Sequence, residues 1–298
     1  MVDYILGVLF GILAGLLNFF GQVLEKKAIN DTAPQRRKKG LVKSLVRNKT
    51  WLFGIICVVA FSSIFLFIGQ AIVGAALMPG LGASGFIVLA IGSVFILKES
   101  LRISEILAII LLAIAITLIG LSQLAIVGSV TYFSDAEFDV RLALFSILST
   151  VLWLGLFYFG RKARRYSSIL LALGTGFPFV LGNLWLQPMI VSLTVIFGGS
   201  AGIFGWEVFL ISVTITALAD VVGLGHYQYA LNAGNASIVV PIQQIPQQIA
   251  PIIIYFLIYQ FASPSPYSLY FLVGGTVLIC LAGFSLGKRQ ASLEQIKT

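Results

Sequence analysis

Four glutamines lie within six residues of one another inside an otherwise apolar segment, residues 236–259. They are Gln243, Gln244, Gln247 and Gln248, and the prolines Pro241, Pro246 and Pro251 interrupt the same segment. Because proline has no amide proton, each one leaves the carbonyl four residues earlier without its helical partner. Amides and freed carbonyls together favour a neutral, oxygen-rich site for a cation or a polar solute. The predicted substrate-binding residues are Asn235, Ser237, Gln243, Gln244, Gln247, Gln248 and Tyr255.

The helical period arranges these side chains on a face. At ~100° per residue, Gln244, Gln247 and Gln248 share one face of the predicted helix, and Gln243 flanks it. Ser237 and Tyr255 lie on the same face. The alternative interpretation is that the glutamines bond neighbouring helices, each such bond contributing roughly 1 kcal/mol.

Asp220 is interpreted as the deepest carboxylate of the chain, in the apolar run 205–229. Ionisable groups at membrane depth are costly and mark ion or proton pathways. Asp220 is therefore either a coupling or cation site, or a structural partner of Asn18 or Gln22. Secondary pathway candidates are Asn18, Gln22, Asn183, Gln187 and His226, the last expected near the membrane surface. Glu99 and Glu105 are expected to pair with Lys98 or Arg102.

The residues that enzymes need are scarce. The chain has one histidine and no nucleophile with an adjacent base, so the sequence argues against an intramembrane enzyme. Cys57 and Cys280 stand alone in apolar runs and are expected to behave as small hydrophobic residues. No phosphate-binding glycine loop is present, and no cofactor is expected. A channel is a further alternative, although no filter loop is evident.

The composition requires a lipid environment. Of the 298 residues, 59% are hydrophobic and only 10% are charged, and the mean hydropathy is +1.02. The sequence predicts an all-α polytopic membrane protein with nine transmembrane helices, because a span needs about 20 apolar residues. The nine runs are 4–23, 51–72, 75–97, 104–126, 141–160, 167–196, 205–229, 236–259 and 268–287.

Basic residues fix the predicted orientation. With nine spans, 18 of the 19 Lys and Arg residues are placed on one face, the exception being Arg141. This indicates a multi-pass protein of the cell membrane with its N-terminus outside and its C-terminus cytoplasmic. The basic loop 24–50 has no interleaved aromatic residues, which argues for attraction to anionic lipid and against nucleic acid. We expect a monomer or homodimer with a small-molecule or ion substrate.

Two segments suggest an internal repeat. Residues 75–80 open the third run with Ala-Ala-Leu-Met-Pro-Gly, and residues 236–241 open the eighth with Ala-Ser-Ile-Val-Val-Pro. The two runs cross the membrane in opposite directions, as an inverted repeat requires. The predicted halves are 1–126, with four helices, and 127–298, with five.

Several motifs of the chain resemble the drug/metabolite transporter superfamily, and most closely its NIPA-like magnesium transporter branch. They are Lys26-Lys27, Trp51-Leu-Phe-Gly, Leu97-Lys-Glu-Ser-Leu, Ala230-Leu and Asn235-Ala-Ser-Ile-Val-Val-Pro-Ile. The resemblance implies an inverted-repeat transporter working by alternating access, and its branch implies magnesium. It also implies a packing or gating role for Glu99 as an alternative to its pairing with Lys98 or Arg102. The chain differs from that branch at Tyr229, Asn232, Gln243 and Gln244. A cation such as Mg²⁺ and a polar organic metabolite therefore both stay open as substrates.

Overall fold

The protein is helical wherever its structure is described. The computed structural model describes residues 2–33, 40–73, 81–122, 135–163, 165–199, 203–263 and 265–296. Within these ranges there is no β-strand. Seven stretches are long and apolar enough to cross a membrane: Tyr4–Asp31, Lys49–Gly69, Ala136–Lys162, Ser167–Phe197, Gly205–Ala233, Ala236–Ile258 and Ser268–Leu286. The all-α prediction is confirmed, and the fold fits a polytopic membrane protein.

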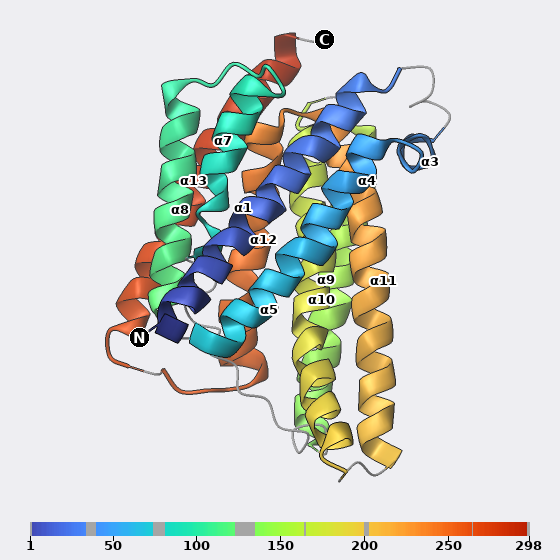
Figure 1. The fold of residues 1–298 in the computed structure, drawn as a ribbon, viewed down its shortest axis with the longest axis vertical. Helices are drawn as coiled ribbons and strands as arrows, with labels where there is room; N and C mark the ends of the chain where they lie inside the picture. Colours follow the sequence, from blue (N-terminus) through green and yellow to red (C-terminus); the bar gives the residue numbers. More distant parts are fainter. Residues whose placement is uncertain are drawn as a thin grey trace.

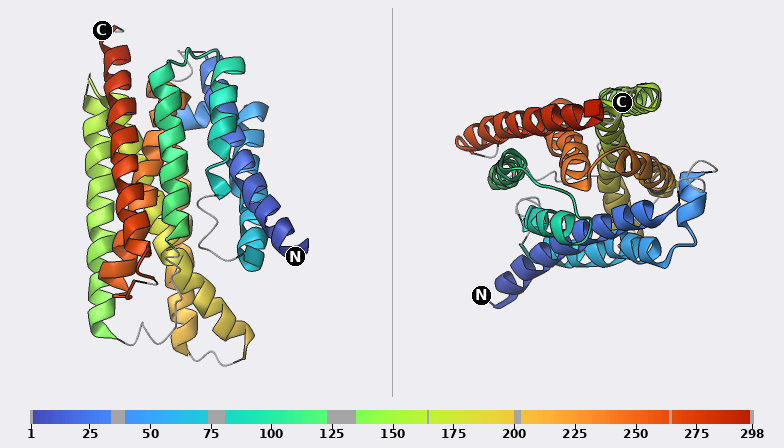
Figure 2. Two further views of the ribbon diagram at one scale, coloured as in Figure 1. Left: turned by 90° about the vertical axis from the view of Figure 1, so that its left-hand side faces the viewer. Right: turned by 90° about the horizontal axis from the view of Figure 1, so that it is seen from above.

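The helices of the first half do not form a single group, because the last of them packs against the C-terminal helix (Figure 1 and Figure 2). The elements of this half are α1 (Val2–Asp31), α3 (Leu41–Leu45), α4 (Lys49–Ile55), the π-helical turn η1 (Ile56–Phe61), α5 (Ser62–Val73), α7 (Gly85–Phe95) and α8 (Ile103–Leu121). The runs predicted at 75–97 and 104–126 correspond to α7 and α8, which are not among the seven candidate spans. Part of each run, including residues 75–80 of the predicted repeat, lies outside the described residues. Nine spans and the repeat therefore stay predictions.

The second half contributes five α-helices within the described residues. They are α9 (Ala136–Lys162), α10 (Ser167–Phe197), α11 (Ile203–Ala233), α12 (Ala236–Ile253) with its π-helical extension η3 (Ile254–Ile258), and α13 (Ser268–Ile296). Helix α12 lies among the other helices, with α1 and α5 in front of it in Figure 1. This central position brings the glutamine-rich segment into the interior of the protein.

Helix α1 corrects one sequence expectation. The basic loop was expected over residues 24–50, but α1 stays helical to Asp31 and α4 begins at Lys49. Glu25 and Lys26 are therefore helical, and both are buried. The apolar run ends near residue 23 because these two side chains are charged, yet their partners inside the protein let the helix continue.

Glycines let the helices of the first half cross closely. A Cβ atom added to Gly21 of α1 would lie 2.5 Å from the carbonyl oxygen of Gly54 in α4. Similarly, a Cβ atom on Gly15 would lie 2.3 Å from the carbonyl oxygen of Gly82. Small residues at such contacts are typical of membrane helices, where close backbone approach replaces the hydrophobic driving force.

The basic residues gather at one end of the molecule. At the upper end in Figure 1 lie the C-terminus, the end of α1, α3, the turn between α3 and α4, the start of α4, the turn between α7 and α8 and the turn between α9 and α10, and Figure 2 shows the N-terminus lower down. These segments carry every Lys and Arg of the described ranges except Arg141. Arg141 lies instead beside Asp135 and Glu137, at 3.9 and 3.5 Å.

Candidate functional site

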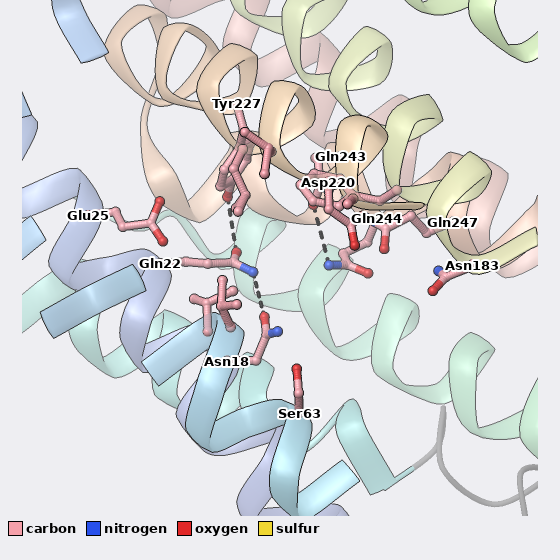
Figure 3. A pocket seen from close by; sticks show the side chains of 16 residues that line it. Asn18, Gln22, Glu25, Ser63, Asn183, Asp220, Tyr227, Gln243, Gln244 and Gln247 are labelled. Atoms are coloured by element: carbon pink, nitrogen blue, oxygen red, sulfur yellow. Dashed lines mark hydrogen bonds between the residues drawn. The ribbon is translucent and has the colours of Figure 1, made fainter. Parts of the chain in front are cut away.

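A cavity of about 330 Å³ lies between the two halves, where the middle parts of α1, α10, α11 and α12 face η1 and α5. Its polar lining comes from both halves (Figure 3): Asn18, Gln22, Glu25, Ser63, Asn183, Asp220, Tyr227, Gln243, Gln244 and Gln247. Val58 and Val59 of η1 also line it. Such π-helical turns often occur at functional sites because they turn side chains out of the regular helical spacing.

Helix α1 presents a row of hydrogen-bonded amides to the cavity. Asn18 and Gln22 are four residues apart and thus share a helical face, and the Gln22 amide donates to Asn18 Oδ1 at 2.6 Å. The Tyr227 hydroxyl of α11 donates to Gln22 Oε1 at 3.0 Å. Gln22 therefore bonds Asn18 within α1 and Tyr227 of α11, and among the described residues no hydrogen bond joins Asn18 or Gln22 to Asp220.

Glu25 is a carboxylate of the cavity lining that the sequence did not predict. Its side chain is fully buried, and its Oε2 accepts a hydrogen bond from Gln228 Nε2 at 2.5 Å. Gln228 is itself held by Trp51, whose indole nitrogen donates to Gln228 Oε1 at 3.0 Å. The other oxygen, Glu25 Oε1, has no partner among the described residues. A buried acceptor left unpaired costs about 1–3 kcal/mol, and more when charged, so this oxygen is available to a ligand.

Asp220 enters the cavity from α11. Its carboxylate lies against the backbone of Gly182 in α10, where an added Cβ atom would come within 2.5 Å of Asp220 Oδ1. The absent side chain of Gly182 therefore makes room for the carboxylate. The ion pairs of the described ranges involve neither Asp220 nor Glu25.

Helix α12 supplies three of the four glutamines, but on a face rotated from the predicted one. Gln243, Gln244 and Gln247 line the cavity, and Gln248 is not among its lining residues. Gln243 is 3% exposed, and its Oε1 accepts a long hydrogen bond of 3.4 Å from the side-chain amide of Gln244. The cause is the contact with α10, where Gly176 fits against Gln243 and Pro246. That contact turns Gln243 from the expected flank into the lining.

Three other predicted substrate-binding residues lie away from the cavity. Asn235 belongs to the turn between α11 and α12 and lines a separate polar pocket there. Ser237 is buried in the first turn of α12, six residues before Gln243. The Tyr255 hydroxyl donates to the carbonyl of Ala262 at 2.9 Å, which fixes the end of η3.

The secondary candidates divide in the same way. Asn183 lines the cavity, whereas Gln187, about one turn further along α10, does not. His226 is held between α9 and α11, where its Nδ1 accepts from the Trp153 indole at 3.1 Å and its ring stacks on Phe157 at 3.8 Å. Its role in the structure is packing within an aromatic cluster.

The charge of the cavity is one-sided. Two carboxylates line it, and none of its described lining residues is Lys, Arg or His. No group of three or more His, Cys, Asp or Glu side chains that could enclose a metal occurs in the described part of the chain. The cavity therefore offers two separated acids and a set of neutral amides.

No protein-family model matches the chain, and no curated protein and no solved structure matches it either. Its function is therefore argued from the cavity. Carboxylate and amide oxygens in a partly enclosed cavity suit a hydrated divalent cation or a small organic cation. The amide nitrogens can in addition donate to the polar groups of such a solute.

Proposed function

We propose that the chain is a secondary transporter of the cell membrane that carries a cation through this cavity by alternating access. The observation that supports the proposal is that both Glu25 and Asp220 line a cavity in which no described lining residue is basic. An ionised carboxylate that is buried without a counter-ion is strongly destabilising. A cationic substrate offsets that cost, whereas an anionic one adds to it.

Magnesium is the first candidate substrate. Mg²⁺ keeps several waters and binds one or two carboxylates in place of a complete protein cage. A cavity of about 330 Å³ is far larger than the ~30 Å³ that one water occupies in the liquid. It therefore has room for an ion with most of its hydration shell. Amide oxygens from Gln243, Gln244 and Gln247 then bind the outer waters.

A small polar organic solute is the second candidate, and the number of amides favours it. Asn18, Gln22 and Asn183 join the three glutamines of α12 in the lining. Each primary amide both donates and accepts hydrogen bonds, and a metal ion cannot accept a hydrogen bond from the amide N–H groups. An organic ammonium compound would use the carboxylates and the amides together.

The gathering of basic residues at one end supports an orientation. Positively charged loops favour the cytoplasmic side. We therefore propose that the upper end in Figure 1, with the C-terminus, is cytoplasmic and that the N-terminus is outside. In alternating access, the halves 1–126 and 127–298 move against each other about the central site, as inverted repeats do in other transporters.

The test uses purified protein in liposomes with an entrapped Mg²⁺ indicator, together with binding titrations of Mg²⁺ and of small organic ammonium compounds. Glu25→Gln and Asp220→Asn keep the shape of each side chain and remove its charge, so each should abolish cation binding and uptake. The matched control is Glu137→Gln, which removes a surface carboxylate that is 86% exposed.

The outcomes separate the candidates. Loss of Mg²⁺ uptake in both variants, with the control unchanged, supports a metal-ion transporter. Loss of binding of the organic ammonium compounds in both variants, without Mg²⁺ uptake by the wild type, supports the organic solute. Normal cation uptake by folded Glu25→Gln and Asp220→Asn proteins would refute cation transport through this cavity.

A further inference from the structure

A buried lysine of the first half holds the C-terminal end of α11. Lys26 of α1 is 6% exposed, and its ammonium group donates to the carbonyl oxygens of Leu231 at 2.5 Å and Gly234 at 2.6 Å. The last carbonyls of a helix lack helical donors and form the negative end of its dipole. A lysine at this position therefore caps α11 from another part of the chain.

A glutamate of the first half holds the start of α12 in the complementary way. Glu99 lies in the turn between α7 and α8, and its two carboxylate oxygens accept from the amides of Ala236 at 2.8 Å and Ser237 at 3.1 Å. Helix α12 begins at Ala236, so these are amides of its first turn, at the positive end of its dipole. Glu99 was expected to pair with Lys98 or Arg102, and this contact is different.

The backbone before Glu99 is shaped for this contact. Lys98 has a φ of 57°, in the left-handed region that side chains other than glycine rarely adopt. The amide of Glu99 donates back to the carbonyl of Ser93 in α7 at 2.9 Å. A strained residue persists where its surroundings hold it, and here it places Glu99 against α12.

Both contacts lie at the upper end of the protein in Figure 1. In Figure 1 α1 and α4 approach α11 at the upper end, where Trp51 of α4 bonds Gln228 of α11, and α5 diverges from α10 and α11 toward the lower end. The turn between α11 and α12 lies at the upper end, above the cavity. Lys26 and Glu99 thus tie both sides of this turn to the first half and close the upper end.

We propose that Lys26 and Glu99 form a latch on the turn between α11 and α12, and that this latch must release before the cavity opens at the C-terminal end. The proposal rests on the proposed transport function. Glu25 connects the latch to the site, because it lines the cavity while its Oε2 binds Gln228 of α11. A cation that binds the unpaired Oε1 of Glu25 draws the carboxylate toward the cavity and competes with its bond to Gln228, and so favours release.

The test measures the width of that end directly. Spin labels are placed at Asn30 of α1 and Lys162 of α9, both exposed, in a protein with Cys57 and Cys280 replaced by alanine. Distances between the labels are measured by pulsed electron spin resonance. Lys26→Met and Glu99→Gln keep the side-chain size and remove the charge. Each should raise the ratio of long to short distances roughly tenfold, the change for about 1.4 kcal/mol.

Lys27→Met is the matched control, because Lys27 is the adjacent lysine and is exposed. It should leave the distances unchanged. The latch is refuted if Lys26→Met and Glu99→Gln lower the melting temperature but keep the wild-type distances, since the contacts then only stabilise the fold. If Lys26→Met does not fold, Glu99→Gln alone decides the matter by the same criterion.

The measurement also separates the latch from the proposed function, because the variants are compared without any substrate. Adding Mg²⁺ to the wild-type labelled protein then tests the link through Glu25. Widening in the variants together with no response to Mg²⁺ supports the latch and counts against Mg²⁺ as the cargo.

Discussion

Replacing Gln243 by leucine should weaken substrate binding, whereas the same replacement at Gln248 should not. The two residues lie five positions apart on α12, and only Gln243 lines the cavity. The helical period alone gave the opposite order, with Gln248 on the polar face and Gln243 at its edge. The pair therefore tests the structure against the sequence pattern with identical chemistry at both positions.

The expected magnitude follows from the contacts of Gln243. Leucine keeps similar bulk and removes both amide groups, so a substrate loses a buried hydrogen bond of about 1–2 kcal/mol. That loss corresponds to a rise of roughly five- to thirty-fold in the dissociation constant. Within the described residues, the only side-chain hydrogen bond of Gln243 is the one its Oε1 accepts from the Gln244 amide at 3.4 Å, which is at the long limit for a hydrogen bond. Stability should therefore change less than affinity.

The assay is a calorimetric titration of purified protein in detergent, combined with thermal unfolding of the same samples. We expect Gln243→Leu to lose affinity at a nearly constant melting temperature, and Gln248→Leu to bind as the wild type does. Equal losses of affinity at both positions, or a larger loss for Gln248→Leu, would show that the α12 face is not as the structure has it. A fall in melting temperature for Gln243→Leu without a change in affinity would make this glutamine a structural residue.

Two further predictions concern the room for Asp220 and the orientation in the membrane. Gly182→Ala should reduce cation affinity, because its Cβ atom would lie 2.5 Å from Asp220 Oδ1 and displace the carboxylate. Gly155→Ala is the control and should leave the affinity unchanged, because nothing lies within 4 Å of a Cβ atom there. Binding titrations compare the two variants, and equal affinities would contradict the prediction. In intact cells, an impermeant thiol reagent should label Glu137→Cys and spare Lys43→Cys, and the reverse pattern would invert the proposed orientation.

The sequence was sufficient to locate the long helices and the principal polar residues. Apolar runs of about 20 residues correspond to membrane spans whatever the tertiary fold, so the seven candidate spans lie where the composition placed them. The spacing of Asn18 and Gln22 predicted a shared face, and their side chains do bond. The rotation of α12 was not predictable, because it depends on the contact of Gly176 with Pro246 between helices far apart in the chain.

The environments of Glu25, Lys26 and Glu99 were not predicted from the sequence, because their partners lie far away in the chain. Charged residues after an apolar run are normally solvated, so Glu25 and Lys26 were assigned to a loop. Their partners are Gln228 and the backbone of the turn between α11 and α12, about 200 residues away. Backbone carbonyls and amides at helix ends leave no trace in residue type, so no pattern could reveal them as partners of a charge.

The adjacency of Glu25 and Lys26 on α1 constrains how the protein can move. Neighbouring helical residues point ~100° apart, so Glu25 can face the cavity while Lys26 faces the end of α11. Helix α1 is also held tightly by α4 through the close contact of Gly21 and Gly54. A helix packed in this way moves with its neighbours as a rigid unit, so a shift that separates Lys26 from Gly234 also displaces Glu25 from Gln228. In the proposed mechanism, a single turn of α1 therefore links the contents of the cavity to the closure of the C-terminal end.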